Sequence, residues 1–179
     1  MVETKYGAIK IAVILATTQN GALGINDRIP WVCPEDMAYF RNKTMNRVCI
    51  VGNKTYQSVK HLKNRHFVVL TNNPEKIAPP SIGVKTLETA YEQAALLAAS
   101  LELVNIIFVI GGGQVYKQVL DDNCVDALYI TYIKGEYQAD TVFSLEPYLG
   151  TKQLYKSIWL SDSAVVDIWR NSQKEEGDQ

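Results

Sequence analysis

Short apolar runs alternate with helical segments along most of the chain. The runs Ile9–Thr17, Arg47–Val51, His66–Thr71 and Asn105–Ile110 are rich in Val, Ile and Phe, as is typical of strands that are covered on both faces. Helical stretches separate these runs, and the clearest of them is the Ala- and Leu-rich segment Leu87–Leu101. This alternation favours an α/β fold built on a largely parallel sheet.

The last part of the chain has strand-like runs with no helix between them. Lys156–Leu160 and Ala164–Trp169 predict a hairpin that turns at Ser161–Ser163. We therefore expect an antiparallel pair at one edge of the sheet, and we expect Trp159 and Trp169 to lie in the core.

Composition excludes several classes of protein. The 179 residues suit one domain, 1–179, with a core that needs no disulfides. The chain has eighteen Lys and Arg and nineteen Asp and Glu, so it lacks the excess of positive charge that is typical of nucleic-acid-binding proteins. No apolar run is long enough to span a membrane. Three scattered cysteines without a C-x-x-C pair indicate neither a disulfide framework nor a metal site. We expect a cytoplasmic protein with no metal, and flexible ends at about 1–8 and 171–179.

Glycines mark two junctions between a strand and a helix. Gly111-Gly112-Gly113 follows a buried strand, and Gly52 follows another. Without side chains, such a turn lets the backbone approach a phosphate at the start of the helix. Each junction alone is also explained by a tight turn without a ligand, and neither matches G-x-G-x-x-G or the P-loop. Two such junctions in one small sheet favour a dinucleotide over a mononucleotide.

Asp36 is the carboxylate of greatest interest. It lies in the first turn of an expected helix, Pro34–Thr44, beside the apolar residues Cys33, Met37 and Phe40. A carboxylate that faces an apolar cleft would anchor a pair of N–H donors on a ligand. By position alone, however, an acidic residue that faces solvent and complements the helix dipole is the better interpretation.

Other polar residues give weaker signals. The long irregular stretch Thr17–Trp31 has the length of a functional loop, and Trp31 could face a cleft. Arg65 could bind a carboxylate with two N–H groups, although a surface charge is the simpler interpretation. His61 and His66 have no metal partners nearby in sequence and are interpreted as surface residues. With no nucleophile elbow and no candidate catalytic histidine, a Ser or Cys hydrolase is disfavoured.

Several sequence blocks, taken in order, closely resemble the dihydrofolate reductase family. They keep the family's order and spacing from about Ile9 to Phe143. Each block alone is weak evidence, but the ordered set is highly specific. The blocks are Ile29-Pro30-Trp31, Pro34-Glu35-Asp36-Met37 with Phe40, Val51 to Ser58, Asn64-Arg65, Val109 to Tyr116, Ile130-Thr131 and Asp140 to Phe143.

The resemblance implies a fold and a reaction. The fold is a central, mostly parallel eight-stranded sheet with an antiparallel C-terminal strand, flanked by four helices. The reaction is the reduction of 7,8-dihydrofolate to 5,6,7,8-tetrahydrofolate with NADPH, in support of one-carbon and thymidylate metabolism. Hydride would pass to pterin C6 and a proton to N5. The family default is a monomer that binds antifolate inhibitors.

The resemblance also implies residue roles. Asp36 would hold the pterin N3 and 2-amino group with help from the Thr131 hydroxyl, Trp31 would help to position a water, and Tyr116 would lie near the nicotinamide. The loop Thr17–Trp31 would close over the nicotinamide. Arg65 would pair with the glutamate α-carboxylate, and the other implied substrate contacts are Ile14, Ala16, Met37, Phe40, Ser58, Val59, Leu62 and Ile110. The implied cofactor contacts are Ala16, Leu23, Gly24, Ile29, Gly52, Asn53, Lys54, Thr55, Leu70, Thr71, Asn72, Lys85, Gly111, Gly112, Gly113, Gln114, Val115, Tyr116 and Thr141.

The chain departs from the family pattern where the cofactor's 2′-phosphate would bind. Asn53 and Gln114 stand where relatives often carry basic residues, which thins the positive charge. Lys54 and Lys85 could compensate. We therefore expect NADPH as the cofactor, with a weaker preference over NADH than is usual. A second departure, at Lys60–Asn64, could reshape the rim that receives the aminobenzoyl group.

Two other functions remain open at this point. A pyrimidine reductase of riboflavin synthesis would share the sheet and the glycine-rich junction, but the block from Pro30 to Phe40 is the folate-reducing pattern. A non-catalytic nucleotide-binding relative would share the fold, but it would be free to lose Asp36, Trp31 and Thr131, which are all present.

Overall fold

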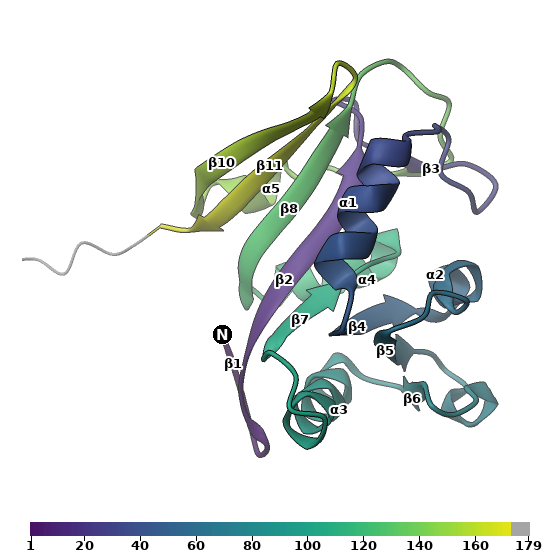
Figure 1. Ribbon diagram of the computed structural model, residues 1–179, viewed down its shortest axis with the longest axis vertical. Coiled ribbons are helices and arrows are strands. Elements are labelled where there is room, and N and C mark those ends of the chain that lie inside the picture. The colour runs from purple at the N-terminus through teal and green to yellow at the C-terminus, as the bar shows by residue number, and fades with distance from the viewer. Residues whose placement is uncertain (173–179) are drawn as a thin grey trace, which may run out of the picture.

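One twisted sheet organises the molecule (Figure 1). A computed structural model describes residues 1–172. Strand β11 runs antiparallel to both of its neighbours, and every other neighbouring pair in the eight-strand path is parallel. The expected sheet is confirmed. Its order is β10 (Lys152–Ser161), β11 (Ala164–Asn171), β8 (Val125–Ile133), β2 (Gly7–Thr17), β7 (Ile106–Val109), β4 (Arg47–Gly52), β5 (Arg65–Leu70) and β6 (Ile82–Val84).

Helices cover both faces of this sheet. Along β2, Ile11, Val13 and Leu15 belong to one core cluster, whereas Ala12 and Ile14 belong to another, because successive side chains of a strand point to opposite faces. The first cluster packs against α3 (Leu87–Ser100) and α4 (Gly113–Asp121), and the second packs against α1 (Pro34–Thr44) and α2 (Asn53–Val59). Burial on both faces explains why the central strands are almost continuously apolar.

The four expected helices are present, and shorter elements accompany them. The N-cap of α3 is Thr86, whose hydroxyl accepts a hydrogen bond from the backbone N–H of Thr89. The sequence analysis did not predict the short helix α5 (Glu146–Leu149) or the 3-10 turn η1 (Pro74–Lys76). None of the helices within residues 1–172 is long and apolar enough to cross a membrane.

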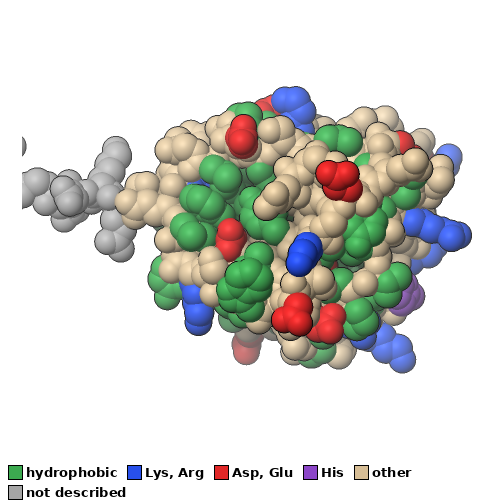
Figure 2. All heavy atoms as spheres, turned by 90° about the horizontal axis from the view of Figure 1, so that it is seen from above, with side chains coloured by type: hydrophobic (Ala, Val, Ile, Leu, Met, Phe, Trp, Pro, Cys, Tyr) green, Lys and Arg blue, Asp and Glu red, His purple; other side chains and the backbone are tan. Residues whose placement is uncertain are grey.

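The expectation that Trp159 lies in the core is wrong. Trp159 is 74% exposed on β10, and Tyr155 on the same strand is also exposed. Strand β10 is the outermost strand of the sheet. Figure 2 shows hydrophobic side chains gathered on the surface in the left part of the view. Trp169, on the inner strand β11, does pack against the core.

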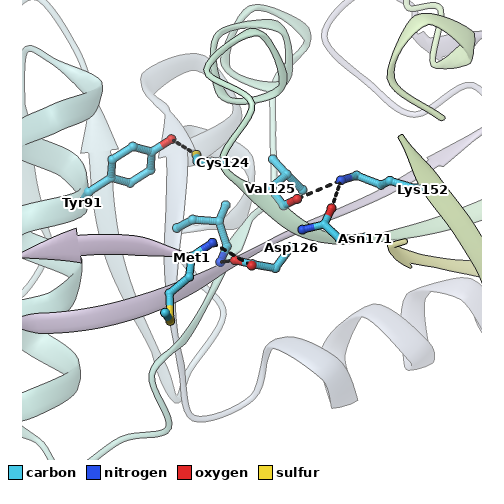
Figure 3. Close-up of polar contacts among 8 residues, drawn as sticks. Met1, Tyr91, Cys124, Val125, Asp126, Lys152 and Asn171 are labelled. Carbon is cyan, nitrogen blue, oxygen red and sulfur yellow. Dashed lines mark hydrogen bonds and ion pairs between the residues drawn. The ribbon is translucent and has the colours of Figure 1, made fainter. Parts of the chain in front are cut away.

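Residues of the expected flexible segment 1–8 pair with the sheet. Strand β1 (Val2–Thr4) pairs antiparallel with β2. The Met1 ammonium contacts one carboxylate oxygen of Asp126 at 2.7 Å, and the other oxygen accepts a hydrogen bond from the backbone N–H of Ile11 (Figure 3). These polar contacts join residues far apart in sequence, which local patterning does not reveal.

At the other end, Asn171 completes β11. Its side-chain oxygen accepts a hydrogen bond from Lys152 Nζ, which also donates to the Val125 carbonyl (Figure 3). The rest of the expected flexible end, 173–179, lies outside the described residues.

Candidate active site

A cleft of about 1040 Å³ opens at the carboxyl ends of the parallel strands, where ligands bind in open α/β sheets. Its walls come from β2, α1, α2, the segment after β5 and the start of α4. Of the site residues expected from the sequence, only Trp31, Thr131 and Arg65 do not line it. The fold therefore brings together residues from position 14 to position 141.

One half of the cleft is lined mainly by apolar side chains. Met37 and Phe40 lie on one face of α1, and Val59 and Leu62 face them from α2 and the turn that follows it. The 48% exposure of Met37 is therefore exposure to the cleft. An aromatic ligand of modest width would find van der Waals partners on both sides here.

Asp36 is the carboxylate in this half. It lies in the first turn of α1 and is half-buried. Burial raises the pKa of Asp36, and the hydroxyl of Thr131 lowers it in part. The cleft thus holds a carboxylate that gains from any ligand able to donate N–H groups to it. The solvent-facing interpretation of Asp36 is not what the structure shows.

Two of the expected catalytic residues lie behind the cleft wall. Thr131 is buried on β8, next to Ala16 of β2, and reaches the Asp36 carboxyl from behind. Trp31 is 7% exposed and packs edge-on against Tyr137, with a ring-centroid distance of 5.5 Å. Neither side chain forms part of the open surface of the cleft.

Tyr116 lies where the two halves of the cleft meet. Its hydroxyl donates a hydrogen bond of 2.9 Å to the backbone carbonyl of Ile14. Burial, together with the nearby charge of Asp36, raises the pKa of Tyr116 well above its usual value. The phenol therefore stays protonated at neutral pH and fixes the end of β2 at the cleft floor.

The other half of the cleft is formed largely by backbone. A Cβ at Gly112 would lie 3.0 Å from the Thr55 hydroxyl oxygen, and a Cβ at Gly52 would lie 3.0 Å from a methyl group of Val115. Gly111 has φ +125°, a conformation that favours glycine. The two glycine junctions identified from the sequence therefore adjoin each other in this half, where the Gly52 N–H donates to the Gly111 carbonyl at 2.8 Å. The free N–H groups at the start of α4 suit an anionic ligand.

A loop between β2 and α1 closes the edge of this half. Within it, β3 (Ala22–Gly24) pairs with β9 (Thr141–Val142), which the sequence analysis treated as irregular. The carboxylate of Asp140 accepts a hydrogen bond of 2.7 Å from the backbone N–H of Asn26. Asp27, next along the loop, forms an ion pair of 2.6 Å with Lys54 on α2.

A recess of about 250 Å³ adjoins this half of the cleft. Amide and hydroxyl side chains dominate its wall, and Lys76 is its one cationic residue. Lys54, which could have compensated for Asn53, is already paired with Asp27. Lys85 lines the main cleft.

Arg65 begins β5 and lies beyond the open end of the apolar half. Its guanidinium donates to the Arg41 and Lys63 carbonyls at 2.6 Å each, and to the Thr44 hydroxyl at 3.2 Å. Burial, and the nearby charge of Arg41, lower the pKa of Arg65. Arg65 is therefore a fixed cation and not the loose surface charge that sequence position alone suggested.

Several residues that line the cleft were not expected from the sequence. Arg41 follows Met37 by four positions and so shares its helix face, a signal that could have identified it. His61 was interpreted as a surface residue but lies at the mouth of the cleft. The others give no signal of their own in the sequence: Leu15, Asp27, Arg28, Asn73 and Gln118. Within residues 1–172, no three His, Cys, Asp or Glu side chains come together to hold a metal ion.

Comparison with known proteins agrees with this geometry. The family model described as dihydrofolate reductase matches residues 10–157. Dihydrofolate reductase type 9 of Escherichia coli is 36% identical over 169 residues, which cover 90% of this chain and 87% of that protein. Dihydrofolate reductase type 3 of Salmonella typhimurium is 32% identical over 153 residues, which cover 85% and 89%.

A solved structure shares the fold. Dihydrofolate reductase from Enterococcus faecalis, complexed with NADP(H) and RAB-propyl, superimposes with a TM-score of 0.75 at 23% identity and covers 92% of this chain and 97% of that chain. Together with the family match over most of the sequence, this shows that the chain belongs to the dihydrofolate reductase family of oxidoreductases.

Proposed function

We propose that the protein reduces 7,8-dihydrofolate to 5,6,7,8-tetrahydrofolate with NADPH and so supplies one-carbon and thymidylate metabolism. The observation that carries the proposal is a half-buried carboxylate, Asp36, in an apolar pocket that opens onto two adjoining glycine junctions. One part of the cleft thus suits a flat heterocycle with N–H donors. The adjoining part suits a phosphate-bearing cofactor.

The apolar half would position the pterin. Asp36 would accept hydrogen bonds from pterin N3 and the 2-amino group, and Thr131 would hold its carboxylate in place. Met37, Phe40 and Leu62 would pack against the rings and exclude water.

The glycine half fits a dinucleotide. Side chains at Gly52 or Gly112 would fill the space beside Val115 and Thr55, and the free N–H groups at the start of α4 would bind phosphate oxygens. When bound, NADPH supplies the hydride that the reaction requires. The chain's own part is to hold Ile14, Ala16 and Ile110 at the floor where the two ligands would meet.

The preference for NADPH over NADH should be weak. The recess beside Asn53 holds a single lysine, and Lys54 is paired with Asp27. Lys76 in the recess and Lys85 in the main cleft are therefore the lysines left for a 2′-phosphate. We expect kinetic efficiencies with the two cofactors that differ less than is usual for the family.

Inhibitors of the 2,4-diaminopyrimidine class should bind the same carboxylate. Such a ring binds well when protonated, because it then presents two N–H donors and a positive charge to Asp36. The Asp36→Asn variant should lose most of this affinity. Affinity unchanged by the substitution would contradict the assigned site.

Loss of NADPH absorbance on addition of dihydrofolate tests the reaction, with wild type and Asp36→Asn compared directly. We expect rapid oxidation by the wild type and a large loss in the variant. A folded wild type that binds NADPH but leaves dihydrofolate unreduced would overturn the proposal. The pyrimidine of the riboflavin pathway would then be the next substrate to test.

A further inference from the structure

The recess beside the glycine half of the cleft has two walls that come from separate segments of the chain. Helix α2 supplies Asn53 and Gln57 for one wall. The other wall belongs to the recess loop, residues 71–81, which connects β5 with β6 at the same side of the molecule as α2 (Figure 1). Its lining residues are Thr71, Asn73, Lys76 and Ile77. The shape of the recess therefore depends on how this loop is held against α2.

The sheet fixes the recess loop from behind. The backbone N–H of Thr71 donates to the Val84 carbonyl at 2.9 Å, next to the pairing of β5 with β6. A Cβ at Gly83 would lie 2.5 Å from the Pro74 carbonyl oxygen, so β6 packs directly against η1. These contacts attach the loop to the sheet, whereas its distance from α2 depends on other contacts.

One hydrogen bond joins the two walls of the recess. The hydroxyl of Tyr56, on α2, donates to the hydroxyl oxygen of Ser81, in the recess loop, at 3.0 Å. Within residues 1–172, no other hydrogen bond or ion pair connects α2 with the recess loop. This contact therefore couples the position of the loop to the position of the helix.

The aromatic ring of Tyr56 is held independently of its hydroxyl. Tyr56 is 9% exposed and packs edge-on against Phe67, with a ring-centroid distance of 5.6 Å. Ile77 of the recess loop packs against the same core cluster. A phenylalanine at position 56 would keep these apolar contacts and lose only the hydrogen bond to Ser81.

Lys76 is the one cationic residue in the recess wall. It is exposed, and none of the ion pairs formed among residues 1–172 involves it. Its backbone N–H donates to the Asn73 carbonyl at 3.1 Å, so its position follows that of η1. A phosphate group would gain a charge-assisted hydrogen bond from this lysine, whereas an uncharged hydroxyl would gain much less.

NADPH and NADH differ by one phosphate, on a ribose far from the reacting carbon. We infer that Tyr56 is a positioning residue for the choice between them, because its hydrogen bond to Ser81 holds the recess loop where Lys76 can reach that phosphate. Tyr56 lines neither the cleft nor the recess, so it acts through the loop. This inference rests on the proposed function.

Fluorescence titration of the Tyr56→Phe variant with both cofactors tests the inference. We expect the dissociation constant for NADPH to rise about fivefold, as for loss of one hydrogen bond. The dissociation constant for NADH and kcat at saturating NADPH should stay within about twofold. A general structural defect would weaken both cofactors alike. Equal changes for the two cofactors, or no change for NADPH, would overturn the inference.

A second variant shows whether the effect passes through the hydrogen bond. Ser81→Ala removes the acceptor and should give the same loss, and the double variant should be no worse than either single one. Tyr91→Phe is the matched control, because it removes a hydroxyl that donates to Asp122, outside the cleft and the recess. It should leave the ratio of the two affinities unchanged. Additive losses in the double variant would contradict the assigned role of Tyr56.

Cofactor fragments separate the inference from the proposed reaction. Calorimetric titration should compare adenosine 2′,5′-bisphosphate with AMP, which lacks the 2′-phosphate. We expect the wild type to bind the bisphosphate more tightly, and this advantage should shrink in Tyr56→Phe and in Lys76→Gln. Equal binding of both fragments by the wild type would overturn the inference and leave the proposed function intact. A wild type that prefers the bisphosphate but does not reduce dihydrofolate would instead overturn the proposed function.

Discussion

The two halves of the cleft recognise ligands by different means. The apolar half uses side chains: Asp36 for charge, with Met37, Phe40 and Leu62 for contact. The other half uses backbone made accessible by Gly52 and the glycines at 111–113. Substitutions in the first half should therefore change chemistry and leave folding largely intact. Substitutions in the second half should change the shape of the backbone that lines the cleft, and should therefore change both cofactor binding and the stability of the fold.

The largest effect is expected for Asp36→Asn. Losing the carboxylate should lower kcat by about a hundredfold or more, while the NADPH dissociation constant stays within about twofold because Asp36 lies in the other half. Steady-state rates and a fluorescence titration with NADPH measure the two quantities. Glu35→Gln, an exposed acid in the same helical turn, is the control and should change neither. Equal losses of rate and of cofactor affinity would abolish the distinction between the halves.

The same variant should alter the pH dependence of stability. Because the folded-state pKa of Asp36 is raised, the ionised carboxylate destabilises the fold at neutral pH, and its replacement by Asn should raise the melting temperature there. The difference should shrink as pH falls through the raised pKa toward the ordinary aspartate value. Melting curves from pH 4 to pH 8 measure it. A variant that melts below the wild type at pH 8 would contradict the assigned burial.

Arg65→Leu comes next in size. Loss of the charge-assisted contact should raise KM for dihydrofolate about tenfold or more, with little change in kcat. The variant also leaves the Arg41 and Lys63 carbonyls without their donor, so some loss of stability is expected. Arg65→Lys keeps the charge without the planar fork and should give an intermediate KM. A lower kcat at unchanged KM would argue against substrate binding by Arg65.

Gly111→Ala tests the backbone half. At φ +125° an alanine should cost about 1–3 kcal/mol of stability, and its Cβ would lie 3.3 Å from the Tyr116 hydroxyl. NADPH binding should weaken severalfold. Gly7→Ala is a matched control, because Gly7 has φ +113° with no atom within 4 Å of a Cβ there. It should show the loss of stability without the loss of cofactor affinity.

The smallest effect is expected for Asn53→Arg, which adds charge beside the recess. The ratio of kcat/KM for NADPH to that for NADH should rise about two- to fivefold, as for an exposed ion pair. Asn73→Arg, which also lines the recess, offers a second position for the same charge. A strong NADPH preference in the wild type, unchanged by either substitution, would show that the phosphate is recognised elsewhere.

Local sequence signals predicted most of the fold. Pro34 at the start of α1, the apolar strands and the glycines after β4 and β7 each act within a few residues, so their elements were expected nearly where they lie. The pair β3–β9 joins segments far apart in the chain, and nothing local indicates it. Strand β1 pairs with the next strand, β2, but its three residues are too few to show a strand pattern in the sequence. Trp159 is exposed because β10 is the outermost strand, which is a property of the topology and not of the residue.

The site was predicted less evenly. Family motifs identified most of the residues that line the cleft, but the roles of these residues in this chain stay predictions. The fixed guanidinium of Arg65 and the position of His61 at the cleft mouth became visible only when α1 and the α2–β5 turn were placed together. Residue type alone does not tell whether an arginine is free on the surface or fixed by hydrogen bonds. It also does not tell whether a histidine lies on the open surface or at a cleft.

Besides the β3–β9 pairing, two carboxylates hold the loop over the glycine half: Asp27 contacts Lys54, and Asp140 accepts a hydrogen bond from the backbone N–H of Asn26. Neither fastening includes a group that would touch a reacting atom. Entry and release of a nucleotide at this end of the cleft thus depend on how often these two contacts break. We expect the residence time of a bound nucleotide to respond to ionic strength and to substitutions at Asp27 or Asp140, even where the chemical step does not. The rate of nucleotide release can therefore change while the residues that carry out the reaction stay the same.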